Sequence, residues 1–462
     1  MKASITFHGG VGSVTGANFL LEVYPENGGV DSLKILVDCG FFQGSKVADD
    51  QNRQKFAYDP ASIDYLLITH AHLDHIGRIP KLVKDGFKGK IYSTPPTREI
   101  SELSLIDSMG VLEKESRGSN LPPIYTEQDV EQAMRLWEVR NYHESFSLEK
   151  GEVKISVQMR DAGHILGSSM FEFIVNNKKI VFTGDLGNSP NLLLPDTEVL
   201  KDVDYLLMES VYGDRNHESR ELSREKLEDI IENTMKIGGT LMIPVFSIER
   251  TQEMIYEIEK MMDEGRIPPV PVFLDSPLAI KVTSIYEKHI NYFNQSALAQ
   301  SHLSHGLFKF PQLRQTLTTD ESRAIAGEGQ KIILAGSGMS NGGRILHHEK
   351  RYLSDPNSAL ILAGYQAAGS LGRQLEDGLK RVKILGQEIE IRAKIISVSG
   401  YSGHKGSDDL LDFVTKASDN LKKVFVVMGE TKSSLYLVQK IRDYLGLDAI
   451  APSPGERVEL SL

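Results

Sequence analysis

The segment His70-Ala71-His72-Leu73-Asp74-His75 is the densest group of potential metal ligands in the chain. Imidazole and carboxylate groups are the usual protein ligands of zinc and similar ions. In an extended segment alternate side chains point the same way, so we expect His70 and His72 to face one metal ion. Asp74 and His75 begin a helical pattern and can face a second ion. A cluster of surface or capping residues is the alternative interpretation.

Two further potential ligands lie in loops next to apolar segments. His164 lies in RDAGHILGSS at 160–169, and Asp185 ends KKIVFTGD at 178–185. Taken singly, an aspartate at a strand end is more often a helix cap, and a lone histidine is more often structural. Together with 70–75 they give four histidines and two aspartates, enough for a two-metal site with a shared carboxylate.

Alternating apolar runs and helical patterns supply the elements that must position these residues. Runs of four to six apolar residues, bounded by polar residues or glycine, predict strands buried on both faces. Helical periodicity predicts helices at 219–236 and 248–262. This alternation indicates an α/β architecture. The strands are expected within 33–40, 63–70, 178–185, 203–210, 239–246, 331–338, 393–400 and 422–429.

Seven residues mark the places where these predicted strands end. Sites in open α/β sheets are assembled at the carboxyl ends of the strands, where loops leave the sheet. We therefore expect the chemistry in these loops. The residues at or just beyond the strand ends are Asp38, His70, Asp185, Glu209, Ser337, Ser399 and Met428.

Length and composition limit the number of domains and the classes of partner only broadly. The 462 residues predict two to three domains, or one large domain with an insertion. A net charge of −11 disfavours a protein that coats nucleic acid over its whole surface, but it allows a local basic groove. No apolar run approaches the ~20 residues that cross a bilayer, so no membrane partner is expected. The single cysteine, Cys39, fits a reducing cytoplasm.

These motifs resemble those of the metallo-β-lactamase superfamily. Its HxHxDH loop, later histidine and later aspartate match 70–75, His164 and Asp185, and its strand-end aspartate matches Asp38. Connecting stretches such as VGSVTGAN, DCGFFQG and GSGMSNGGRILHH agree as well, so the resemblance covers nearly the full chain.

The resemblance extends to the β-CASP nuclease branch, including bacterial relatives of the eukaryotic pre-mRNA 3′-end endonuclease. Glu209 in LLMESVYGDR is similar to the acidic motif A of this branch, and SGH at 402–404 is similar to its motif B. In this branch a β-CASP α/β domain is inserted into the αββα sandwich of the lactamase fold, with the active site in the cleft between them. The resemblance thus implies lactamase segments at 1–211 and 391–462 and an inserted domain at 212–390.

The resemblance also implies two zinc ions, with manganese as an alternative. A metal-bound hydroxide would hydrolyse RNA phosphodiesters in the interdomain cleft and leave a 5′-phosphate and a 3′-hydroxyl. By the family's pattern, the ligands are His70, His72, His164 and Asp185 for the first ion, and Asp74, His75 and the bridging Asp185 for the second.

Besides Asp74, two residues are implied to be catalytic and one to support the ligands. His404 is the family's candidate general acid for the departing oxygen. Glu209 would orient His404 and raise its pKa. Asp38 would position a ligand histidine. A turn cap is the alternative interpretation of Glu209, and a packing residue is that of His404.

The glycine-rich segment GSGMSNGGR at 336–344 precedes a helical pattern. Its backbone N–H groups are candidates to hold a phosphate of the substrate. A glycine-rich turn without a ligand, and arginines on a solvated helix face, are the alternatives. The candidate substrate-binding residues are Ser337, Gly338, Arg344, Ser402 and Arg250.

One motif departs from the family. Motif C is a histidine in a strand-end HGE string that completes the second metal site, and here KKVFVVMGE places Met428 at that position. A thioether is a poor substitute for imidazole on zinc or manganese. We therefore expect weaker occupancy of the second site.

The leading hypothesis is a metal-dependent ribonuclease, mainly an endonuclease, with 5′–3′ exonuclease action as an option. Its expected partner is RNA, with a homodimer left open, and its expected location is the cytoplasm. A catalytically weakened RNA-binding or scaffold member is the alternative that Met428 motivates. A small-molecule hydrolase such as a thioesterase or lactamase, and a DNA substrate, are further alternatives.

Overall fold

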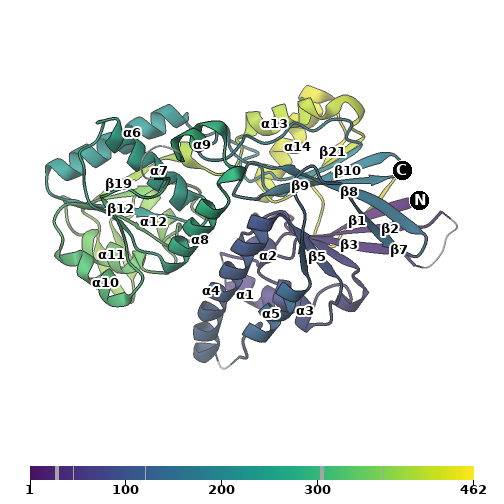
Figure 1. The fold of residues 1–462 in the computed structure, drawn as a ribbon, viewed down its shortest axis with the longest axis horizontal. Helices are drawn as coiled ribbons and strands as arrows, with labels where there is room; N and C mark the ends of the chain where they lie inside the picture. Colours follow the sequence, from purple (N-terminus) through teal and green to yellow (C-terminus); the bar gives the residue numbers. More distant parts are fainter. Residues whose placement is uncertain (27–30, 45, 120, 302–305, 368) are drawn as a thin grey trace. The chain divides into compact units, whose positions relative to one another are not determined.

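The computed structural model describes residues 1–26, 31–44, 46–119, 121–301, 306–367 and 369–462. The chain forms two compact units (Figure 1). Unit 1 comprises Met1–Asn191, Pro195–Asn216 and His404–Leu462, and unit 2 comprises Leu192–Leu194 and His217–Gly403. The chain therefore leaves unit 1 and returns to it, and both termini belong to unit 1.

Unit 1 contains two seven-stranded sheets. The first has the strand order β22-β1-β2-β3-β4-β5-β6 and the second the order β21-β20-β11-β10-β9-β8-β7. The first sheet consists of β1 (Lys2–Gly9), β2 (Asn18–Tyr24), β3 (Leu33–Val37), β4 (Tyr65–Leu67), β5 (Lys90–Ser93), β6 (Trp137–Val139) and β22 (Arg457–Leu460). The second consists of β7 (Phe146–Lys150), β8 (Val153–Asp161), β9 (Ser169–Val175), β10 (Lys178–Phe182), β11 (Tyr205–Met208), β20 (Lys423–Val426) and β21 (Ala449–Ile450).

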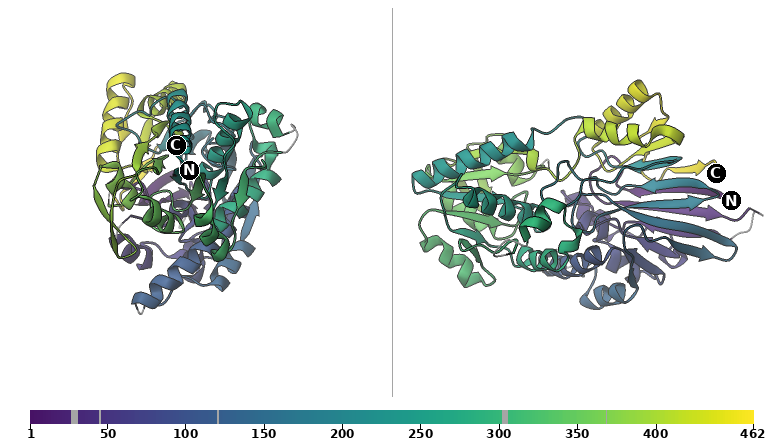
Figure 2. Two further views of the ribbon diagram at one scale, coloured as in Figure 1. Left: turned by 90° about the vertical axis from the view of Figure 1, so that its left-hand side faces the viewer. Right: turned by 45° about the horizontal axis from the view of Figure 1, so that its top comes forward.

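The two sheets pack face to face, and helices cover their outer faces. Phe7 and Phe19 from the first sheet share a core with Phe173 and Phe182 from the second. A second apolar cluster lies between the first sheet and its helices, and a third lies between the second sheet and α13 and α14. The predicted αββα sandwich is confirmed (Figures 1 and 2). The helices are α1 (Lys46–Arg53), α2 (Leu73–Ile76), α3 (Ile79–Lys84), α4 (Pro95–Ser119) and α5 (Glu127–Arg135), then α13 (Ser407–Lys416) and α14 (Thr431–Leu445).

Unit 2 is built on a six-stranded parallel sheet of order β14-β13-β15-β12-β16-β19. Its strands are β12 (Thr240–Pro244), β13 (Val272–Leu274), β14 (Leu313–Gln315), β15 (Lys331–Ala335), β16 (Ala359–Leu362) and β19 (Lys394–Ser397), with a hairpin of β17 (Arg381–Ile384) and β18 (Gln387–Glu390). Its helices are α6 (Arg220–Lys236), α7 (Arg250–Asp263), α8 (Pro277–Lys288), α9 (Gln295–Ser301), α10 (Thr319–Ala324), α11 (Ile345–Tyr352) and α12 (Leu371–Glu376).

The predicted strands and helices are confirmed, with shorter strands than the sequence runs. For example, the run at 178–185 gives β10 over Lys178–Phe182, and the run at 239–246 gives β12 over Thr240–Pro244. The remaining residues of the runs lie in the loops that precede or follow the strands. Within the residues that the structure describes, no helix has the length and apolar character needed to cross a membrane.

Candidate metal centre

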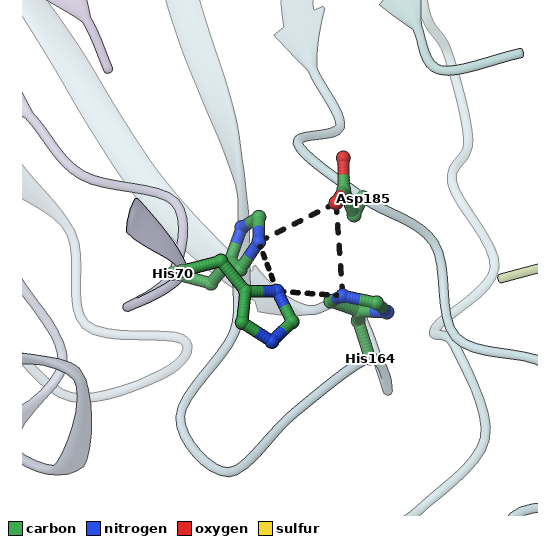
Figure 3. A group of neighbouring side chains, drawn as sticks. His70, His164 and Asp185 are labelled. Atoms are coloured by element: carbon green, nitrogen blue, oxygen red, sulfur yellow. Dashed lines mark hydrogen bonds and ion pairs between the residues drawn. The ribbon is translucent and has the colours of Figure 1, made fainter. Parts of the chain in front are cut away.

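Three histidines and one aspartate converge in unit 1. The chain is extended after β4, and His72 caps α2 with β-type backbone angles. His72 Nδ1 lies 3.1 Å from His70 Nε2 and 3.3 Å from His164 Nε2. Asp185 Oδ2 lies 3.4 Å from His70 Nε2 and 3.6 Å from His164 Nε2 (Figure 3). One ligand atom from each residue therefore lies within 4.8 Å of the others.

Burial keeps two of these imidazoles neutral. It lowers the pKa of His72 and of His164 well below the usual value, and the neighbouring His70 and His404 act in the same direction. A neutral imidazole offers a lone pair, which is what a metal ion requires of a histidine. This group of four is therefore suited to one divalent cation.

Asp74, His75 and Asp185 form a second group beside the first. His75 Nε2 lies 3.4 Å from Asp185 Oδ1 and 4.0 Å from Asp74 Oδ2. Both His75 Nε2 and Asp185 Oδ1 are buried, and within the described parts of the chain neither has a hydrogen-bond partner. Burying such polar atoms unpaired is costly, and a cation between them would satisfy both. The donor set thus fits a second metal ion.

The charges in this second group favour a cation. Burial opposes the charged form of His75, but Asp185 and Asp38 raise its pKa well above the usual value. Burial likewise opposes ionisation of Asp185, yet His75 and His70 hold the pKa of that carboxyl well below its usual range. A divalent cation would neutralise these carboxylates as the imidazolium does.

Asp38 and Thr69 contact the candidate ligand histidines. Asp38 Oδ2 lies 2.7 Å from His75 Nδ1 and accepts a hydrogen bond from the Thr69 hydroxyl at 2.8 Å. Thr69 Oγ1 in turn lies 3.0 Å from His70 Nδ1. Sequence analysis did not find Thr69, because a threonine before a histidine has no distinctive pattern. Its buried place between two strand ends identifies it.

Close backbone contacts hold the ligand loops in place. Cys39 N donates to His75 O at 2.7 Å, and Ala17 N donates to Asp74 O at 2.9 Å. A Cβ on Gly40 would overlap the Asp74 carbonyl, so this position requires glycine. The loop after β3 is thereby fixed against α2, which carries Asp74 and His75.

Glu209 and His404 lie together next to Asp185. His404 Nδ1 lies 3.1 Å from Glu209 Oε1 and 4.0 Å from Asp185 Oδ2. Glu209 is fully buried and accepts a hydrogen bond from Leu186 N at 2.7 Å. Burial disfavours the charged form of His404, but the Glu209 carboxylate outweighs it and raises the pKa of His404 to about 9. These contacts therefore favour the protonated form of His404 at neutral pH.

Met428 lies in the loop after β20 and is 2% exposed. Its side chain belongs to the core between the two sheets, where it packs against Gly10. Its backbone N–H donates to Gly10 O at 2.7 Å. An apolar side chain therefore fills the motif C position.

The five candidate substrate-binding residues all belong to unit 2. The Arg344 guanidinium donates to Asp275 Oδ1 at 2.7 Å and to Leu317 O at 2.8 Å. Arg250 is paired with Glu253 on its own helix. Ser337 Oγ accepts a hydrogen bond from Asn341 N at 3.0 Å within the glycine-rich loop, next to Gly338. Ser402 is 2% exposed. Their contact with substrate stays a prediction.

Three segments match models of known domain families. Residues 29–211 match a metallo-beta-lactamase superfamily domain, and residues 251–375 match a Beta-Casp domain. Residues 388–452 match a Zn-dependent metallo-hydrolase RNA specificity domain.

Several characterised proteins are similar along most of their length. The chain is 38% identical to a ribonuclease of Thermus thermophilus over 406 residues, which cover 87% of this chain and 89% of that protein. It is 32% identical to an RNase J-like protein of Methanocaldococcus jannaschii, covering 98% of both. It is 31% identical to the transcription termination factor FttA of Methanosarcina mazei, covering 99% of this chain and 71% of that protein.

One solved structure is similar to this chain in fold. A protein of unknown function from Enterococcus faecalis has a TM-score of 0.53 at 14% identity, with full coverage of both chains.

The αββα sandwich with a His/Asp cluster at its strand ends defines a metallo-hydrolase of the metallo-β-lactamase superfamily. Within it, the chain belongs to the β-CASP family.

Proposed function

We propose that the chain is a zinc-dependent ribonuclease that hydrolyses RNA phosphodiesters. The observation that carries this proposal is the placement of the Glu209–His404 pair beside Asp185, the residue shared by both candidate metal groups. A simple metal-binding site needs no protonated imidazole, whereas cleavage of a phosphodiester needs a proton for the departing oxygen. The RNA relatives and the RNA specificity domain model support this substrate.

We assign two zinc sites, with manganese as the alternative metal. His70, His72, His164 and Asp185 would hold the first ion, and Asp74, His75 and Asp185 the second. When bound, the ions would supply a nucleophile at neutral pH and neutralise charge on the phosphate. The second ion would bind more weakly, because Met428 provides no imidazole.

Side chains of this protein would supply the proton for the departing oxygen and orient the ligands. His404 gives its proton to the departing oxygen, and Glu209 keeps His404 protonated and oriented. Asp38 fixes the orientation of His75 through Nδ1. The segment 212–390 would be the β-CASP domain that helps to hold RNA, with candidate contacts at 336–344. A cytoplasmic location and a homodimer remain predictions.

Cleavage of a 5′-labelled RNA with added zinc or manganese tests this function. We expect wild type to cut and Asp185→Ala to lose about 100-fold or more, because both metal groups lose a ligand. Asp320→Ala is the matched control, since the Asp320 side chain is 94% exposed, and it should cut like wild type. Equal cleavage by Asp185→Ala would refute the proposal.

The weakened, non-catalytic alternative is not favoured, because the ligands other than motif C lie together beside the candidate general acid. A chromogenic β-lactam and a thioester, tested with the same preparation, should not be turned over. Rapid turnover of either substrate with no RNA cleavage would favour the small-molecule hydrolase instead.

A further inference from the structure

The sheet of unit 2 has a topological switch point beside the glycine-rich loop. From β12 the chain moves to β13 and β14, then reverses through β15 to β16. The strands β12 and β15 are neighbours, and the loops that follow them both begin at the carboxyl ends of the strands. One loop runs to α7 and the other to α11, on different sides of the sheet (Figure 1). Ligands of open parallel sheets bind in the crevice at such a point.

An exposed aromatic ring lies at this point. Phe246 follows β12 and is 38% exposed, although Val245 just before it is buried. A Cβ on Gly338 would lie only 2.6 Å from the Phe246 ring, so the ring rests directly on the backbone of the loop after β15. The Thr251 hydroxyl donates to Phe246 O at 2.7 Å and fixes the segment. The ring is thus held in place while part of it remains open to solvent.

Neutral hydrogen-bonding groups lie in the loops after β12, β13 and β15. Ser247 Oγ and Ser276 Oγ are 3.5 Å apart, and both lie within 4 Å of the place where a Cβ on Gly336 would be. In the described residues, the N–H groups of Gly338 and Met339 have no acceptor. These hydroxyl and amide groups can bond to a phosphate or a ribose.

The arginine at the end of the glycine-rich loop is held by residues outside that loop. Arg344 is bound to Asp275, Thr316 and Leu317. Asp275 is itself completely buried and accepts further hydrogen bonds from Thr316, Ser322 and His348. These contacts occupy the guanidinium of Arg344. The ring and the neutral donors are therefore the groups left to meet a ligand beside Phe246.

We propose that Phe246, seated on Gly338, is a stacking platform for one nucleobase of the RNA substrate. The hydroxyl and amide groups beside it contact the sugar or phosphate of the same nucleotide. This inference rests on the proposed ribonuclease function, which supplies the nucleic acid. A stacked base is recognised by its flat face, so the platform accepts any of the four bases.

Binding of a hydrolysis-resistant phosphorothioate oligoribonucleotide, followed by fluorescence anisotropy, tests the platform. Phe246→Leu keeps an apolar side chain but removes the aromatic face, and we expect it to weaken binding by about 5- to 30-fold. Phe246→Trp should bind within about threefold of wild type, because the larger ring still stacks. Ile237→Ala is the matched control. Ile237 is 54% exposed, but it precedes β12 and so lies near the amino end of that strand, whereas Phe246 follows its carboxyl end.

An oligonucleotide with abasic sites separates stacking from backbone contacts. Phe246→Leu and wild type should bind it equally, since it has no base to stack. Gly338→Ala, which displaces the ring, should weaken binding of the normal oligonucleotide if its thermal midpoint stays that of wild type.

Equal affinity of wild type and Phe246→Leu for the normal oligonucleotide would overturn the platform, while RNA cleavage by wild type would still support the ribonuclease. A wild type that neither binds nor cleaves RNA would refute both.

Discussion

The buried carboxylate of Asp38 interacts with histidines of both candidate metal groups, with one directly and with the other through Thr69. Asp38 Oδ2 contacts His75 directly and reaches His70 through the Thr69 hydroxyl. A hydroxyl that donates to the carboxylate can accept from His70 Nδ1, which leaves His70 Nε2 free of a proton. With a metal ion bound, His70 and His75 would each keep the remaining proton on Nδ1, and both Nε2 atoms lie next to Asp185.

Thr69→Val tests the hydrogen bonds that the Thr69 hydroxyl makes with Asp38 and His70, because it removes that one oxygen atom. Valine has nearly the same shape but cannot donate or accept, so His70 loses its orienting partner. We expect zinc affinity, measured by competition with a chelator, to fall by about 10- to 100-fold. Thr69→Ser keeps the hydroxyl and should bind zinc like wild type. The connection is wrong if the valine and serine variants bind zinc equally well.

The Glu209 carboxylate should control the alkaline limb of the pH–rate profile. His404 acts as an acid only while protonated, and its pKa is raised to about 9. Cleavage should therefore fall as the pH rises through about 9. Glu209→Gln removes the charge that raises this pKa, so the fall should begin at lower pH.

Steady-state cleavage rates from pH 6 to about 10 measure the shift. His404→Asn should cleave RNA more slowly, and its pH–rate profile should no longer show the alkaline limb. An alkaline limb that stays in place in Glu209→Gln would exclude this role of Glu209.

At the scale of elements, the ligands depend on backbone segments that touch without side chains between them. The loop after β3 lies against α2 at Gly40, and the loop after β10 lies against the His164 loop at Gly187. In both places a Cβ would overlap a carbonyl group of the other segment. These contacts bring the ends of separate strands close enough for their side chains to share a metal ion.

Gly40→Ala should be strongly destabilising for this reason. The added methyl group would overlap the Asp74 carbonyl, so backbone must move, at a cost of about 3 kcal/mol or more. Gly110→Ala is the control: it lies inside α4, and among the described residues outside its own helical turn no atom lies within 4 Å of its Cβ position. It should stabilise by about 0.5–1 kcal/mol through helix propensity. Urea denaturation midpoints compare the two, and similar midpoints would contradict the argument.

The sequence predicted these elements well because apolar runs and helical periodicity are local properties. The strand ends at His70, Asp185 and Glu209 could be located from such runs. Thr69 could not, because its role arises only when β3 and β4 lie side by side.

The partners of Arg344 could not be predicted either. They come from Asp275, Thr316 and Leu317, far away along the chain. The sequence showed an arginine after a glycine-rich loop, and only the packed sheet shows what it binds.

At the scale of the whole molecule, the site joins segments from both ends of the chain. The last segment returns to unit 1, where β20 pairs with β11 and β22 pairs with β1. It contributes His404, ahead of α13, and Met428, after β20. The first metal group needs only residues before 212, whereas the family's second group also requires a histidine from this returning segment. The loss of that histidine should therefore affect the two ions unequally.

Met428→His should restore the second metal ion. In wild type, titration of the metal-free protein with zinc should give one tight equivalent and a second that binds more weakly, because Asp74, His75 and Asp185 lack a fourth protein ligand. An imidazole at 428 adds that ligand, so the second equivalent should bind about tenfold more tightly or better, with the first unchanged.

Met428→Leu is the control for this titration. It keeps the apolar packing against Gly10 and should titrate like wild type. If the leucine variant and wild type already bind two equivalents as tightly as Met428→His does, then Asp74, His75 and Asp185 hold the second ion unaided, and the methionine is only a packing residue. If instead Met428→His alone gains the tight second equivalent and cleaves RNA faster, the wild-type enzyme works with its second site only partly filled at low zinc.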